Sequence, residues 1–221
     1  MPTLVKICGL KTADALDAAL DAGADLVGFV FFPPSPRHLD FDTARRLGAR
    51  VGGRARKVAL TVDADDATFA RIRETLGPDM LQLHGRETPQ RVAGLKARFG
   101  LPVMKALPVE TGADLAATAG YRDVADWFLF DARPPRDATR PGGLGRPFDW
   151  TLLKDLDPGL RFMLSGGLDA GNVAEALRIA RADGVDVSSG VERSPGEKDP
   201  EKIRAFIRAA RHAPQPAASI V

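Results

Sequence analysis

Eight short apolar runs recur along the chain, and a segment of helical periodicity follows most of them. They begin near Leu4, Leu26, Lys57, Met80, Val103, Trp127, Phe162 and Val185. Most positions in each run are apolar, which is typical of parallel strands that are buried on both faces and joined by helical crossovers. The alternation predicts the α/β class, as a single-domain (β/α)8 TIM barrel with parallel strands. An open doubly wound sheet, with its ligand at a switch point, is the alternative.

Helices are expected in the segments between the strands, several of them with a capping residue in front. Their expected ranges are 13–22, 42–51, 65–76, 89–99, 113–121, 148–153, 171–182 and 200–211. The barrel would form one domain over residues 1–212, because a chain of 221 residues with 44% hydrophobic side chains supports one substantial core. A Pro- and Ala-rich tail at residues 213–221 is expected to be flexible.

Composition and charge argue against several classes of protein. The net charge is +2 and no basic run is interleaved with aromatic residues, so we expect no nucleic-acid partner. Every apolar run is far shorter than the ~18 residues that cross a bilayer, and the first residues do not read as a secretion signal. We therefore expect no membrane partner and a cytoplasmic location. Cys8 is the only cysteine and the three histidines are scattered, so neither an internal disulfide nor a metal site is expected.

Two of the segments that follow strands are unusually long. FPPSPRHLD follows the second strand, and ARPPRDATRPGGLGRP follows the sixth. In a barrel such loops lie at the carboxyl ends of the strands, the face on which active sites are built. Arg37 in the first loop suggests an anion clamp, and Gly142, Gly143 and Gly145 in the second suggest a hinged lid. Insertion without a function is the alternative for both loops.

Two turns in the last third of the chain have the composition of a phosphate cradle. FMLSGG at residues 162–167 and VDVSSG at residues 185–190 each run from an apolar strand into small residues. Glycines let backbone N–H groups approach an anion, and a hydroxyl group or a helix N-terminus adds to the attraction. The candidate phosphate-binding residues are Gly166, Gly167, Ser189 and Gly190. A small phosphorylated molecule is therefore the first hypothesis for the ligand.

Several strands end on ionisable side chains. Cys8 ends the first strand in KICGL, two residues after Lys6, a cation that would favour the thiolate. Asp131 ends the sixth strand in WFLFD, where burial would raise its pKa as a general acid requires. His84 in LQLHG and Asp186 in VDVSSG are candidate substrate contacts. Each of these residues also has a structural alternative, as a small buried hydrophobe, a helix cap or a local hydrogen-bonding group.

Taken in order, these motifs resemble those of the phosphoribosylanthranilate isomerases. The matching segments are KICGL, the SPRHL loop, LQLHG, LFD, PGGLGRPFDW, LSGGLDAGNV and VDVSSGVE, which together span residues 4 to about 211. The resemblance implies a (β/α)8 barrel that uses no cofactor and no metal. It also implies the Amadori rearrangement of N-(5-phosphoribosyl)anthranilate to 1-(2-carboxyphenylamino)-1-deoxyribulose 5-phosphate, in tryptophan biosynthesis.

By this resemblance Cys8 would be the general base, Asp131 the general acid, and Arg37 the residue that faces the anthranilate carboxylate. The SGG and SSG turns would hold the phosphate, and PGGLG would be a mobile loop, with Leu144 where the family often has Thr or Ser. A monomer or a homodimer is expected. Two alternatives remain: a histidine-pathway isomerase of a related aminoaldose, which usually has Asp where Cys8 stands, and a phosphosugar-binding barrel without activity.

Overall fold

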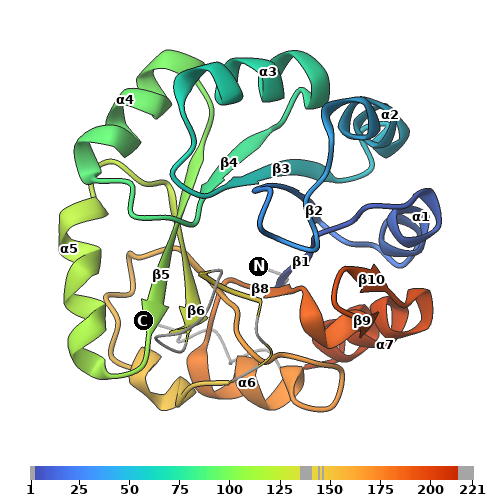
Figure 1. The fold of residues 1–221 in the computed structure, drawn as a ribbon. Coiled ribbons are helices and arrows are strands. Elements are labelled where there is room, and N and C mark those ends of the chain that lie inside the picture. The colour runs from blue at the N-terminus through green and yellow to red at the C-terminus, as the bar shows by residue number, and fades with distance from the viewer. Residues whose placement is uncertain (1–2, 135–140, 144, 146, 214–221) are drawn as a thin grey trace.

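The eight predicted strands form a closed parallel barrel, shown in Figure 1. The computed structural model describes residues 3–134, 141–143, 145 and 147–213. The strands are β1 (Leu4–Cys8), β2 (Leu26–Phe31), β3 (Arg56–Thr61), β4 (Met80–Leu83), β5 (Val103–Val109), β6 (Trp127–Ala132), β7 (Phe162–Leu164) and β8 (Gly184–Val187). The prediction of a (β/α)8 barrel is confirmed, and β3 and β8 each begin one residue before the predicted position.

The barrel closes because β1 pairs with a strand on each side. Lys6 on β1 is in register with Leu26 of β2 and also with Asp186 of β8. An open doubly wound sheet would leave its edge strands unpaired on one side, so this pairing excludes the alternative fold.

Helices surround the barrel and cover the outer faces of the strands (Figure 1). The α-helices are α1 (Ala13–Asp21), α2 (Phe41–Val51), α3 (Asp66–Leu76), α4 (Pro89–Phe99), α5 (Thr118–Tyr121), α6 (Val173–Ala180) and α7 (Pro200–Arg211). The 3-10 helices are η1 (Gly112–Ala117), η2 (Trp150–Leu153) and η3 (Ser189–Val191). Side-chain oxygens of Thr12, Asp40, Asp65, Thr88 and Asp199 accept hydrogen bonds from the first turns of their helices, so local sequence fixes where these helices begin.

Two predicted helices are replaced mainly by 3-10 turns. The predicted helix at 113–121 is η1 followed by the single turn of α5, and neither element buries a side chain. The predicted helix at 148–153 is η2, which buries Leu153 alone. Because most helical stability in proteins comes from packing an apolar face, these segments have little to hold a regular α-helix together.

The predicted helix at 171–182 is also shorter than expected, since α6 covers only Val173–Ala180. The carboxylate of Asp169 accepts hydrogen bonds from the backbone N–H groups of Gly171 and Asn172. This side-chain turn competes with helix formation and delays the start of the helix. At the other end Arg181 adopts a left-handed conformation and ends α6 before residue 182.

A two-stranded hairpin that the sequence analysis did not predict lies between η3 and α7. It consists of β9 (Glu192–Ser194) and β10 (Glu197–Lys198), which pair antiparallel. Gly196 in its turn has a φ of +88°, and a Cβ atom there would lie only 2.5 Å from the carbonyl oxygen of Pro36. The hairpin is therefore packed tightly against the loop that follows β2.

Side chains alternate along each strand between the barrel interior and the surrounding helices. On β6, for example, Phe128 and Phe130 belong to the large outer core, whereas Trp127 and Leu129 belong to a separate inner cluster. The inner cluster fills the amino-terminal part of the barrel with apolar side chains. Nearer the carboxyl ends, inward positions carry Lys6, Gln82 and Asp131, all buried. The strand period thus directs polar groups to one end of the barrel.

No helix in the described ranges is both long enough and apolar enough to cross a bilayer. The same part of the chain brings together no group of three or more His, Cys, Asp or Glu residues that could hold a metal ion. The tail predicted to be flexible lies outside the described residues, apart from Ala213.

Candidate active site

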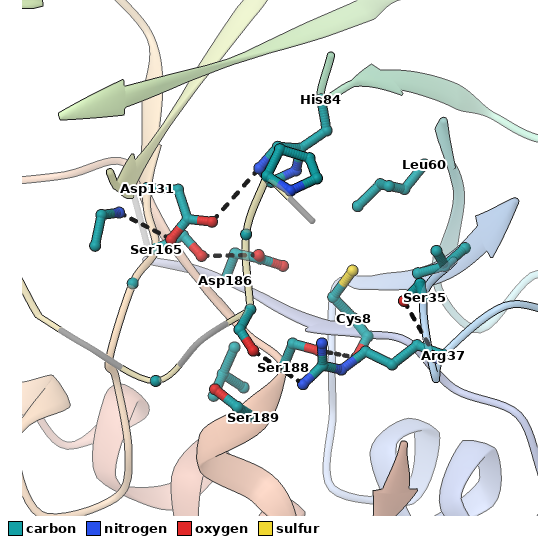
Figure 2. A pocket seen from close by; sticks show the side chains of 18 of the residues that line it. Cys8, Ser35, Arg37, Leu60, His84, Asp131, Ser165, Asp186, Ser188 and Ser189 are labelled. Carbon is teal, nitrogen blue, oxygen red and sulfur yellow. Dashed lines mark hydrogen bonds and ion pairs between the residues drawn. The ribbon is translucent and has the colours of Figure 1, made fainter. Parts of the chain in front are cut away.

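A single pocket at the carboxyl ends of the strands gathers nearly all of the candidate residues (Figure 2). Those that line it are Cys8, Arg37, His84, Asp131, Gly142, Gly143, Gly145, Gly166, Gly167, Asp186 and Ser189. They come from β1, β6 and β8, from η3, and from the loops after β2, β4, β6 and β7. Residues as far apart in sequence as Cys8 and Ser189 therefore line one pocket.

Cys8 ends β1 with its side chain facing the pocket, and it is only 3% exposed. Burial raises the pKa of its thiol, Lys6 and Lys198 oppose the shift, and Asp186 reinforces it. Lys6 does lower the pKa of the thiol, as expected, while its ammonium also pairs with Asp186 at 2.6 Å, but desolvation has the larger effect. In the free protein at neutral pH, Cys8 is a thiol.

Gly28 on β2 explains why Cys8 fits where it does. A Cβ atom at Gly28 would lie 2.9 Å from the sulfur of Cys8, so a larger residue on β2 would displace the thiol. The register places Gly28 directly beside Cys8 in the sheet. A glycine inside an otherwise apolar strand is thus a signal of close approach, and the sequence analysis did not use it.

Asp131 lies on the inward side of β6 and is 5% exposed. Its Oδ1 accepts the backbone N–H of Ala132 at 2.9 Å, and its Oδ2 lies 3.4 Å from Nε2 of His84. No helix begins after β6 within the described residues up to 134, which argues against the alternative that Asp131 is a helix cap. Its second oxygen is directed into the pocket (Figure 2).

His84 follows β4 and contacts Asp131 with one ring nitrogen and the buried Gln82 with the other. Its Nδ1 is 3.2 Å from Nε2 of Gln82, a fully buried side chain two residues earlier on the same strand face. If Gln82 donates to Nδ1, the neutral ring carries its proton on Nε2, the nitrogen that faces Asp131. His84 therefore lies where it can orient the carboxyl group of Asp131.

The glycines that were predicted to form a lid lie close to both Asp131 and Arg37. A methyl group at Gly142 would overlap Oδ2 of Asp131 and crowd Nε2 of His84. The carbonyl oxygen of Gly143 accepts a hydrogen bond from Nη2 of Arg37 at 3.2 Å. Only a residue without a side chain fits against these groups at Gly142. Residues 135–140, Leu144 and Arg146 of this segment lie outside the described residues, so its predicted mobility stays a prediction.

Arg37 has a partner that the sequence analysis did not identify. Its Nε and Nη2 donate to the two carboxylate oxygens of Glu192, each at 2.8 Å, and both side chains are buried. Within the described residues, Nη1 has no hydrogen-bond acceptor. Arg37 also lines the pocket, so among the described residues Nη1 is its donor without a protein acceptor there. Glu192 stands in the VDVSSGVE motif, but no local pattern links it to a residue 155 positions earlier.

The two small-residue turns follow the neighbouring strands β7 and β8 of the barrel. Gly166 and Gly167 have φ angles of +88° and +63°, which side-chain-bearing residues rarely adopt. In the described part of the chain no acceptor is bonded to either backbone N–H. Ser189 lines the same pocket at the start of η3. Adjacent unpaired N–H groups and a hydroxyl are suited to bind an anion.

Gly190 is the one candidate that does not line the pocket. A Cβ atom at this position would lie 1.9 Å from the carbonyl oxygen of Leu168, so the backbone of the β7 loop occupies the space that a side chain would need. Close packing of two loops is a sufficient reason for this glycine. Its proposed contact with phosphate stays a prediction.

Comparison with known proteins identifies the family. Residues 5–209 match the family model for N-(5'-phosphoribosyl)anthranilate (PRA) isomerase. The chain is 68% identical over 211 residues to the N-(5'-phosphoribosyl)anthranilate isomerase of Bradyrhizobium diazoefficiens, covering 96% of this chain and 95% of that protein. It is 66% identical over 211 residues to the isomerase of Rhodopseudomonas palustris strain BisB5, covering 96% and 97%.

Solved structures agree with the sequence comparison. The crystal structure of phosphoribosyl anthranilate isomerase from Thermotoga maritima has a TM-score of 0.85 and 34% identity, covering 94% of this chain and 98% of that one. Another structure of the enzyme, in complex with reduced 1-(o-carboxyphenylamino)-1-deoxyribulose 5-phosphate, has a TM-score of 0.82, 31% identity and the same coverage. The chain belongs to the N-(5'-phosphoribosyl)anthranilate isomerase family.

Proposed function

We propose that the pocket catalyses the family's reaction on N-(5'-phosphoribosyl)anthranilate, with Asp131 as general acid and Cys8 as general base. Family membership makes the chain an intramolecular aldose–ketose isomerase of tryptophan biosynthesis. The observation that carries the assignment of roles is the shared pocket. Its lining combines a buried carboxyl group, a buried thiol, the small-residue turns and Arg37.

Asp131 would begin the reaction by protonating the ring oxygen of the ribose. The C1–O bond then breaks, and the lone pair of the anthranilate nitrogen forms an iminium with C1. Asp131 is left as a carboxylate, which the neighbouring His84 can stabilise by a hydrogen bond from Nε2. Because the Asp131 side chain is buried, the proton is delivered with little competition from bulk water.

Cys8 would then remove the hydrogen at C2. Burial raises the pKa of the thiol, so Cys8 first has to give its proton to water before the thiolate can act as a base. A positive iminium formed in the same enclosed pocket favours the thiolate electrostatically. Removal of the C2 proton moves an electron pair to the iminium nitrogen and gives an enolamine, which tautomerises to the ketone. The iminium is the electron sink, so the chemistry calls for no cofactor.

The two ends of the substrate would be held by separate anion sites. The N–H groups of Gly166 and Gly167, with Ser189, fit the phosphate, and the free edge of Arg37 fits the anthranilate carboxylate. These contacts lie away from the bonds that change. Their binding energy is therefore available to position C1 and C2 between the acid and the base.

Turnover by the purified protein tests this proposal directly. We expect conversion of phosphoribosylanthranilate to the carboxyphenylamino ketose, with much lower activity toward the aminoaldose of the histidine pathway, because that pathway's isomerases usually have a carboxylate where Cys8 stands. Product formation is measured for both substrates by chromatography. Binding of ribose 5-phosphate without turnover of either substrate would show instead a phosphosugar-binding barrel.

A further inference from the structure

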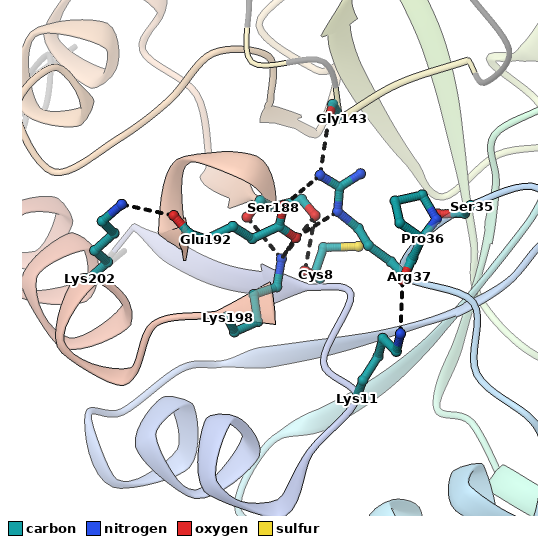
Figure 3. Close-up of polar contacts among 10 residues, drawn as sticks. All are labelled: Cys8, Lys11, Ser35, Pro36, Arg37, Gly143, Ser188, Glu192, Lys198 and Lys202. Carbon is teal, nitrogen blue, oxygen red and sulfur yellow. Dashed lines mark hydrogen bonds and ion pairs between the residues drawn. The ribbon is translucent and has the colours of Figure 1, made fainter. Parts of the chain in front are cut away.

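The hairpin formed by β9 and β10 carries two buried charges that the proposed mechanism does not use. Glu192 on β9 is 7% exposed and Lys198 on β10 is 8% exposed. Figure 3 shows both side chains directed from the hairpin toward Arg37 and the backbone near Cys8. Burial of two charged side chains is costly unless they are paired, so their place beside the pocket calls for an explanation.

Glu192 fixes the plane of the Arg37 guanidinium. Its two oxygens accept from Nε and Nη2 of Arg37 at 2.8 Å each, a geometry that holds a guanidinium in one orientation. The backbone of Glu192 is itself held, because Nζ of Lys202 on α7 donates to its carbonyl oxygen at 2.8 Å. With one edge committed to Glu192, Arg37 presents Nη1 as its free donor within the described residues.

Lys198 joins the same carboxylate from the other side. Its Nζ donates to Oε1 of Glu192 at 2.7 Å and to the carbonyl oxygen and hydroxyl of Ser188, at 2.8 and 3.1 Å. The Ser188 hydroxyl in turn donates to the carbonyl oxygen of Cys8 at 3.1 Å. Lys198 is thus bonded to the carboxylate of Glu192, which holds Arg37, and to Ser188, which is bonded to the backbone of Cys8.

The charges of this cluster do not cancel. Arg37 and Lys198 are two cations, and Glu192 is the one carboxylate that pairs with both. Without Lys198, the charge of Glu192 would balance that of Arg37, and the pair would attract a second carboxylate only weakly. With Lys198 present, the buried cluster has one positive charge in excess, which one incoming carboxylate would balance.

We propose that Glu192 and Lys198 are positioning residues for carboxylate recognition: Glu192 orients Arg37, and Lys198 supplies the excess positive charge that makes the site selective for an anthranilate carboxylate. This inference rests on the proposed contact between Arg37 and that carboxylate. The hairpin then determines which substrates bind well without touching the atoms that react.

The test compares two ligands that each carry one half of the substrate. Inhibition constants for anthranilate and for ribose 5-phosphate are measured with wild type, Lys198→Met, Glu192→Gln and Glu197→Gln. Glu197 is the matched control, because it is an exposed carboxylate on the same hairpin, and among the described residues its side chain pairs with Ser194 alone. Circular dichroism and thermal melting establish that each variant is folded, and Lys198→Gln provides a second neutral variant.

We expect Lys198→Met and Lys198→Gln to weaken the binding of anthranilate at least about tenfold, the usual scale for loss of a charge-assisted contact. The binding of ribose 5-phosphate should weaken by less than about threefold. KM should rise while kcat changes little, and Glu197→Gln should match wild type. An unchanged anthranilate constant in both folded Lys198 variants would overturn the inference, as would equal losses for the two ligands.

A parallel measurement on Arg37→Ala separates this inference from the proposal on which it rests. If Arg37→Ala weakens anthranilate selectively and the Lys198 variants do not, the role of the hairpin is wrong and that of Arg37 stands. If Arg37→Ala leaves anthranilate binding unchanged, Arg37 does not bind the carboxylate and both proposals are overturned.

Discussion

At the scale of the residue, the reactivity of this pocket depends on how burial acts on individual ionisable groups. The thiol of Cys8 is desolvated at the end of β1, and burial raises its pKa more than the nearby ammonium groups lower it. Lys6 is the main group that opposes this effect, although its Nζ also bonds Asp186 at 2.6 Å. If Cys8 is the base, as proposed, the substrate has to change the charge of the pocket before the thiol can act.

The protonation state of Cys8 can be measured directly, because it is the only cysteine in the chain. We expect the rate of alkylation by iodoacetamide in ligand-free protein to rise with pH, with a midpoint above 9.0, the ordinary pKa of a cysteine thiol. The rate is measured by mass spectrometry on folded protein. A midpoint below 8 would mean that the thiolate already exists in the free enzyme and that the substrate is not needed to form it.

Lys198 provides a second test, of stability rather than activity. Burial lowers the pKa of Lys198 to about 8, although Glu192 opposes the shift. Between about pH 8 and 10.5 the unfolded chain holds this proton while the folded chain has lost it, so folding stability gains from Lys198 as pH rises. Below pH 8 the lysine is charged in both states, and the full cost of burying it is present.

We therefore expect the free energy of unfolding of wild type to rise between pH 7.5 and 9 by on the order of 1 kcal/mol more than that of Lys198→Met. Urea unfolding at each pH gives the free energies, and the difference between the two proteins removes the contribution of groups that they share. Parallel pH profiles for the two proteins would show that Lys198 keeps an ordinary pKa in the fold.

At the scale of the element, regular strands and capped helices were predictable because local sequence determines them. Thr12 and Thr88, for instance, each cap the helix that they precede. The segments at 113–121 and 148–153 were predicted as helices and are mainly 3-10 turns, because they bury almost no side chain. The hairpin of β9 and β10 was missed because its polar sequence ERSPGEK has no strand-like apolar pattern.

The hairpin's contact with the β2 loop can be tested at Gly196. A Cβ atom there would lie 2.5 Å from the carbonyl oxygen of Pro36, and the residue has a φ of +88°. We expect Gly196→Ala to destabilise the protein by about 1–3 kcal/mol, through strain and displacement of the loop that carries Arg37. Urea unfolding measures the change.

Gly94 is the matched control for that substitution. It lies in the exposed interior of α4, and a Cβ atom there meets nothing within 4 Å. Gly94→Ala should stabilise the protein by up to about 1 kcal/mol, because alanine favours the helix. A neutral Gly196→Ala beside a stabilising Gly94→Ala would show that the hairpin and loop are not held together as described.

At the scale of the whole molecule, the barrel and most of the site follow from one rule: parallel strands bring their carboxyl ends to the same edge. Strand-end residues such as Cys8, His84 and Asp131 could therefore be assigned to a common site from the sequence. The pairing of Arg37 with Glu192 could not, because it joins residues 155 positions apart through a hairpin with no sequence signal. Closure of the barrel likewise required the observed pairing of β1 with β8.

The proposed isomerisation of phosphoribosylanthranilate depends on Cys8 as base and Asp131 as acid in one pocket. The most direct test is kcat for Cys8→Ala and Asp131→Asn, measured on folded protein together with the affinity for ribose 5-phosphate. We predict that each substitution lowers kcat by roughly 10²-fold or more, the usual scale for acid–base catalysis, while the affinity stays within about threefold. A folded variant of either residue with near-wild-type kcat would contradict the account.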